Sequence, residues 1–210
     1  MKKVEELLFT KWTKKRPEMA KDGIVNENEY LKSKVKVLYI LKEVNDWKGG
    51  DLRDLIKEGK RWRTWNNIAR WQNGIQKYYE SGELIFKNHI SKNDRIEFLK
   101  SIAVLNLKKE SGGATSNYHQ IMKHATEDKA LLKEQINLYK PDVIICCGTG
   151  EFVSILNLAG DRKFKPSSNG TKYSKNNENL IISYKHPQAR LEKRILFDNL
   201  MDVIKEVKNV

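Results

Sequence analysis

Four short apolar runs constrain the fold more than any other feature of the sequence. They are rich in β-branched residues and lie at Val35–Leu41, Ile102–Leu107, Val143–Cys147 and Leu180–Tyr184. Each run is short enough to be a buried strand, and polar or turn-forming residues follow each one. Segments of helical character separate them, and strands that alternate with helices favour a parallel sheet covered on both faces. The sequence therefore predicts an α/β fold with three α/β/α layers around a central four-stranded, mainly parallel sheet.

The chain of 210 residues is long enough to bury one sizeable core. We expect a single domain over residues 1–210, with a helical N-terminal extension at about 1–34. The expected helices cover residues 3–12, 51–80, 94–100, 126–139, 151–159 and 190–207. The polar segment 161–179 is expected to be a loop or a loose hairpin.

Lysine and arginine number 40 against 27 acidic residues, which gives a formal net charge of +13. A cationic surface attracts polyanions, because phosphate releases its condensed counterions on binding. The alternative is that the lysines only solvate the surface. No basic amphipathic helix with an apolar face stands out, so DNA is favoured over a membrane as the partner. Since no apolar run reaches the length of a membrane span and no signal peptide is visible, we expect a cytoplasmic protein.

The two cysteines, Cys146 and Cys147, are adjacent within a predicted strand. Neighbouring strand residues point to opposite faces, so we expect two buried thiols rather than a disulfide. The sequence holds neither paired CxxC motifs nor an HExxH motif. We therefore expect neither a metal nor a cofactor.

Polar clusters follow the predicted strands at residues 42–46, 106–109, 148–150 and 185–190. In open α/β sheets, ligands bind outside the carboxyl ends of the strands. The sequence therefore predicts a site where these four clusters meet.

Taken in order, the strand ends resemble the motifs of the uracil-DNA glycosylase superfamily. They are Lys42-Glu43-Val44-Asn45-Asp46, Val104-Leu105-Asn106-Leu107, Gly148-Thr149-Gly150 and Tyr184-Lys185-His186-Pro187. The resemblance spans about residues 35–205 by order and spacing, and no single motif is specific. The first motif lacks the usual Gly and Pro, Gln188 replaces the usual Ser, and the iron–sulfur cysteines of some branches are absent. The resemblance implies a divergent DNA glycosylase, which flips a base out of DNA and hydrolyses its N-glycosidic bond.

The resemblance assigns the catalytic carboxylate to Glu43, with Asp46 as second choice. A carboxylate below the sugar stabilises the cation that forms there and orients the attacking water. His186 would donate a hydrogen bond to the pyrimidine O2 as negative charge develops on the leaving base. The alternative for Glu43 is a solvated acid beside Lys42.

Asn106, Asn45, Trp65 and Trp62 are the expected base-binding residues. The Asn106 amide has a donor and an acceptor that suit the Watson–Crick edge of a flipped pyrimidine. A tryptophan after the first motif would stack on that base. The alternatives are a turn-forming Asn at a strand end and core tryptophans.

The expected DNA-binding residues surround the mouth of the site. They are Lys42, Lys108, Lys109, Lys185, Arg190, Leu191 and Arg194. Arg190 and Leu191 follow His-Pro, where the family inserts residues into the duplex. The alternative for the charged residues is a solvated rim.

Several functions remain open at this stage. The first is DNA repair by excision of uracil or another deaminated base from single- or double-stranded DNA, by a monomer. The second is a phage-defence glycosylase that acts on modified bases. The third is a non-catalytic DNA-binding protein on the same fold. A nucleotide-binding enzyme is poorly supported, because Val153 stands where GxGxxG has its third glycine, and a nucleoside hydrolase would not explain the charge of +13.

Overall fold

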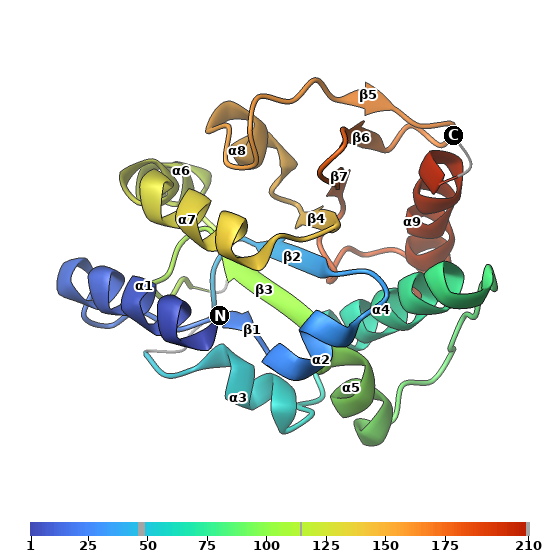
Figure 1. Ribbon diagram of the computed structural model, residues 1–210, viewed down its shortest axis with the longest axis horizontal. Coiled ribbons are helices and arrows are strands. Elements are labelled where there is room, and N and C mark those ends of the chain that lie inside the picture. Colours follow the sequence, from blue (N-terminus) through green and yellow to red (C-terminus); the bar gives the residue numbers. More distant parts are fainter. Residues whose placement is uncertain (46–48, 114, 209–210) are drawn as a thin grey trace.

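The computed structural model describes residues 1–45, 49–113 and 115–208 (Figure 1). Within these ranges, seven strands form one mixed sheet in the order β1-β3-β2-β4-β7-β6-β5. The strands are β1 (Gly23–Ile24), β2 (Val37–Leu41), β3 (Ile102–Asn106), β4 (Val143–Cys147), β5 (Lys165–Pro166), β6 (Lys172–Lys175) and β7 (Leu180–Tyr184). The fold is therefore α/β, as the sequence predicts.

The four apolar runs form the centre of the sheet. β3, β2, β4 and β7 are neighbours, and they pair in parallel. The expected total of four strands is wrong, because β1 pairs antiparallel with β3, and β6 joins β5 to β7 through antiparallel pairing. These added strands are short or largely polar, so they have no apolar run that periodicity could detect.

Helices cover both faces of the sheet, as Figure 1 shows. On one face lie α3 (Leu52–Lys57), α4 (Arg63–Ser81), α5 (Lys92–Leu99) and α9 (Lys193–Lys208). On the other lie α1 (Lys2–Lys15), α6 (Tyr118–Glu127), α7 (Lys129–Tyr139) and α8 (Gly150–Ile155), with α2 (Glu27–Lys32) supplying Tyr30 to the same core. Neighbouring residues of β2 face opposite layers, since Tyr39 packs in the first core and Ile40 in the second.

Two sequence expectations change in detail. Residues 51–80 form two helices, α3 and α4, rather than one, because the chain turns at Gly59, whose φ is +67°. The segment 1–34 is more than a helical extension, since its strand β1 forms the edge of the sheet beside β3. The helices α2 and α6 were not predicted.

Cys146 and Cys147 are buried and free. Burial raises the pKa of the Cys146 thiol to about 12, so this thiol is unreactive. Among the helices of the described ranges, none has the length and apolar character needed to cross a bilayer.

Candidate functional site

The parallel strands bring their carboxyl ends to one edge of the sheet. Leu41 pairs with Asn106, and Cys147 pairs with Tyr184, so the polar clusters begin at the same level. After β2 the chain enters helices of one layer, whereas after β4 it enters α8 in the opposite layer. The connections thus change layer between the neighbouring strands β2 and β4, and α/β sheets bind their ligands at the strand ends beside such a point.

A cavity of about 420 Å³ lies at this edge, and its size suits a small-molecule group. We call it the strand-end cavity. The described residues that line it are Leu41, Lys42, Glu43, Asn45, Trp62, Thr64, Trp65, Gly113, Ser116, His186 and Gln188. It therefore brings together six of the predicted site residues: Lys42, Glu43, Asn45, Trp62, Trp65 and His186.

The Glu43 carboxylate is held by the segment that follows β3. Its Oε2 accepts a hydrogen bond from Lys108 Nζ at 2.7 Å, and both side chains are 6% exposed. Lys108 Nζ also donates to the Ser111 carbonyl at 2.8 Å, and Gly112 N donates to the Val44 carbonyl at 2.8 Å. A Cβ at Gly112 would overlap the Glu43 carboxyl group. The carboxylate is thus fixed by an ion pair and by the lack of a side chain opposite it.

His186 enters the cavity from the turn after β7. Its Nδ1 accepts a hydrogen bond from the Gln188 backbone N–H at 3.1 Å. This bond assigns the remaining proton of the neutral imidazole to Nε2. Burial lowers the pKa of His186, and the nearby Lys42 lowers it further, so the ring is neutral near pH 7. His186 can therefore act as a neutral hydrogen-bond donor through Nε2.

Two tryptophans supply aromatic surface to the cavity. Trp65 is almost fully buried in the first turn of α4, while Trp62 is 48% exposed just before that helix. A flat ligand can stack on such a surface. Thr64, Ser116 and Gln188 add polar groups that the sequence interpretation missed. Gln188 was noted only as a departure from the His-Pro-Ser pattern.

Asn106 does not line the cavity, so the structure gives no support to its base-binding role. It is 2% exposed, its backbone N–H donates to Asp22 Oδ2 at 2.7 Å, and its Nδ2 donates to the same oxygen at 3.3 Å. Asp22 lies in the N-terminal segment, directly before β1. The amide is therefore used to hold the edge of the sheet.

The expected phosphate contact of Lys109 is wrong. The side chain is 0% exposed, and Nζ donates to both Asp22 carboxylate oxygens and to Gln135 Oε1. It also lies over the ring of Trp12, 4.6 Å from the centroid. Lys109 is therefore part of a buried polar network in the second core and does not reach solvent.

The other predicted DNA-binding residues are distributed around the molecule. Lys108 is buried against Glu43, which makes it a positioning residue for that carboxylate. Lys185 and Arg190 are exposed after β7. Leu191 and Arg194 line a different cavity, which is described below. Asp46 lies outside the described residues.

Within the described ranges, no cluster of three or more His, Cys, Asp or Glu side chains is arranged to hold a metal ion. No protein-family model matches the sequence, and a search of curated proteins finds no significant match.

Proposed function

We propose that the protein binds DNA and hydrolyses the N-glycosidic bond of a base held in the strand-end cavity. One observation carries this proposal: Glu43 and His186, which come from different strand ends, line one cavity together with Trp62 and Trp65. An acid, a neutral donor and an aromatic surface are the groups that this cleavage requires.

In the proposed reaction, the bond between the sugar C1′ and the base nitrogen breaks, and the base leaves with the electron pair. The Glu43 carboxylate stabilises the positive charge on the sugar and orients a water molecule. The water oxygen bonds to C1′, and its proton passes to the carboxylate or to solvent. His186 Nε2–H donates to the departing base, while Trp62 or Trp65 stacks on it.

A second candidate is a non-catalytic DNA-binding protein with the same fold. Two observations favour it: Asn106 is bound to Asp22, and Lys108 holds the Glu43 carboxylate in an ion pair. For the glycosylase proposal, the same observation means that Asn45, Gln188 or Ser116 must bind the base edge in place of Asn106. The departures from the family motifs are the reason to test modified bases as well as uracil as substrates.

The two candidates differ in one measurable product. The protein is incubated with oligonucleotides that contain uracil, hypoxanthine, xanthine or modified cytosines, and the DNA is then cleaved with alkali. The glycosylase proposal predicts alkali-labile abasic sites with at least one base. DNA binding without cleavage across the whole panel would favour the non-catalytic candidate.

A further inference from the structure

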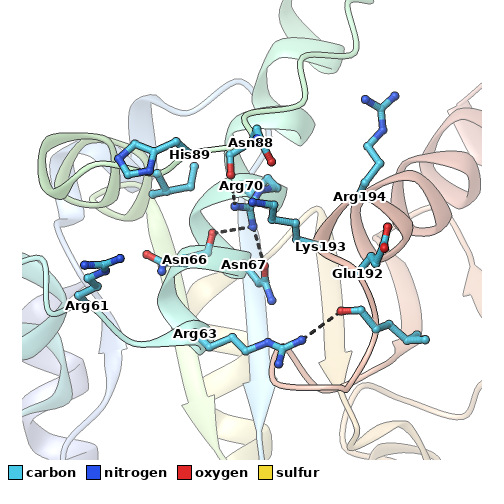
Figure 2. Close-up of a pocket in the computed structure, with 12 residues that line it drawn as sticks. Arg61, Arg63, Asn66, Asn67, Arg70, Asn88, His89, Glu192, Lys193 and Arg194 are labelled. Atoms are coloured by element: carbon cyan, nitrogen blue, oxygen red, sulfur yellow. Dashed lines mark hydrogen bonds between the residues drawn. The ribbon is translucent and has the colours of Figure 1, made fainter.

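A second cavity, of about 810 Å³, lies between the start of α4, residues 88–90 and the start of α9 (Figure 2). We call it the Arg-rich cavity. The cationic residues Arg61, Arg63, Arg70, Lys193 and Arg194 line it, and Glu192 is the one acidic residue among its described lining. Its local charge is therefore strongly positive, which favours an anionic ligand.

Arg70, one of the residues that line this cavity, is a buried cation without a carboxylate partner among the described residues. It is 3% exposed, and its guanidinium donates only to neutral oxygens. These are the carbonyl oxygens of Lys87 at 2.6 Å, Asn88 at 3.3 Å and Asn66 at 3.4 Å, and Asn67 Oδ1 at 2.5 Å. Burial lowers the pKa of Arg70, but a guanidinium stays charged at neutral pH. An anion in the adjacent cavity would balance this charge.

The other buried arginines show that this lack of a carboxylate is specific to one region. Arg16 is paired with Glu110, Glu127 and Asp128, and Arg53 is paired with Glu5, Glu6 and Asp51. Arg95, by contrast, donates to the Gly59 and Ile90 carbonyls and to Asn66 Oδ1, and so shares Asn66 with Arg70. Among the described residues, the two buried arginines without an ion pair to a carboxylate are thus the two that bond to Asn66, and Arg95 additionally has the Asp94 charge nearby.

Two chain segments, 61–67 and 186–191, contribute residues to both cavities. In the first segment, Arg61 and Arg63 line the Arg-rich cavity, whereas Trp62 and Thr64, which alternate with them, line the strand-end cavity. Arg63 Nη2 donates to the carbonyls of Ala189 at 2.8 Å and Leu191 at 3.0 Å, as Figure 2 shows in part.

A hydrogen-bonded chain reaches the His-Pro turn from Arg70. Arg70 donates to Asn67 Oδ1, and Asn67 Nδ2 donates to the Pro187 carbonyl at 2.6 Å, next to His186. A ligand that occupies both cavities would therefore contact both sides of the same two segments, 61–67 and 186–191. A nucleic-acid strand has this form, because it carries a base and, farther along, regularly spaced phosphates.

We propose that the Arg-rich cavity binds a backbone phosphate of the DNA whose base enters the strand-end cavity. The inference rests on the DNA partner of the proposed function, but it does not depend on cleavage. Arg70 supplies a fixed buried charge, and the exposed Arg61 and Lys193 add flexible charges at the rim. Arg194 is partly neutralised by Asp198, whose Oδ2 lies 2.7 Å from Arg194 Nε, so it contributes less.

The test uses the double variant Arg61→Gln/Lys193→Gln, since both side chains are exposed and their loss leaves no described hydrogen bond broken. The matched control is Lys3→Gln/Lys14→Gln, which removes two exposed charges from α1 on the opposite layer. Binding of labelled duplex and single-stranded oligonucleotides is measured by fluorescence anisotropy over a range of KCl concentrations. Loss of a phosphate contact lowers the slope of log K against log [salt] by about 1.

We expect the slope of the cavity variant to fall by about 1 to 2 on duplex DNA, with binding weakened on the order of ten-fold. The α1 control should keep the parental slope. Equal slopes and affinities for the cavity variant, the control and the parent would overturn the inference. The inference would also be overturned if inorganic phosphate raised the melting temperature of the parent but not of the Arg61→Gln/Lys193→Gln variant, while both bound DNA equally. The site would then hold a free anion.

The outcomes for the two proposals are separable. A reduced slope with no abasic product from any oligonucleotide retains the phosphate site and removes the glycosylase reaction. Base excision by the parent, with an unchanged salt slope for the cavity variant, retains the glycosylase reaction and removes the phosphate site.

Discussion

At the scale of single residues, the position of the Glu43 carboxylate depends on neighbours that have no chemical role. Gly112 leaves the space that the carboxyl group occupies, and Lys108 fixes one of its oxygens. Gly113, the next residue, is also in the strand-end cavity, but a Cβ there would meet no atom within 4 Å. The two glycines therefore form a natural matched pair.

Gly112→Ala should displace the Glu43 carboxylate and reduce base excision by about 10²-fold, because catalysis is sensitive to shifts of about 1 Å. Gly113→Ala should keep a rate close to that of the parent. Single-turnover rates on the best oligonucleotide of the panel check both. Equal rates for the two variants would show that the position of Glu43 does not matter for the reaction.

The imidazole of His186 should titrate below the ordinary value of 6.5, chiefly because it is buried and secondly because Lys42 is near. The unfolded chain then binds the proton more readily than the folded one. The stability that this group contributes is fully present above pH 6.5 and is lost as the pH falls through the folded-state pKa.

An NMR titration of the imidazole nitrogens should locate this pKa, with the urea-unfolded chain as reference. Lys42→Met should raise the pKa of His186 only part of the way toward the value in the unfolded chain, since the imidazole stays buried. A folded-state pKa at or above the unfolded value would contradict the described environment of His186.

At the scale of elements, the edge strand β1 explains why some site predictions failed. Glu43 and His186 directly follow strands that the sequence predicts, so the parallel topology alone brings them together. Asn106 lies at the end of a predicted strand and Lys109 follows it, but their partner is Asp22, beside a strand of two residues. A strand that short has no periodicity to detect, so the sequence could not indicate that these polar groups would be used there.

The buried Lys109–Asp22 pair should be essential for stability. Lys109→Met should destabilise the protein by about 3–5 kcal/mol, because it leaves Asp22 buried and unpaired. Urea unfolding measures the difference. Adding Asp22→Asn should recover part of the loss, and the exposed Lys123→Met should change stability by no more than about 0.5 kcal/mol. A loss below about 1 kcal/mol for Lys109→Met would contradict the paired, buried arrangement.

The contact between α4 and α9 depends on a glycine within a helix. A Cβ at Gly74 would overlap the ring of Phe197 on α9 and lie 3.4 Å from Met201 Sδ. Alanine is favoured over glycine in a helix by about 1 kcal/mol, whereas overpacking costs about 1–3 kcal/mol. Gly74→Ala should therefore lower stability in the same urea assay, and Phe197→Leu should relieve part of its effect when the two are combined. A stabilised Gly74→Ala variant would contradict the close packing of these helices.

At the scale of the whole molecule, the sequence predicts the layered fold and the edge of the sheet where the strand-end cavity lies. It does not predict the Arg-rich cavity. Arg61, Arg63 and Arg70 are close in sequence, but they lie in a segment expected to be one continuous helix. Whether an arginine has a carboxylate partner depends on which distant elements pack against it, and a net charge of +13 does not contain this information.

The catalytic role of the strand-end cavity is tested most directly by the single-turnover rate of abasic-site formation for the parent, Glu43→Gln and His186→Ala. DNA affinity is measured in parallel. We expect the parent to act on at least one base of the panel, and each variant to be slower by about 10²-fold or more while its DNA affinity changes little. Parental rates in both variants, or DNA binding by the parent without product from any base, would contradict the proposed role of the cavity.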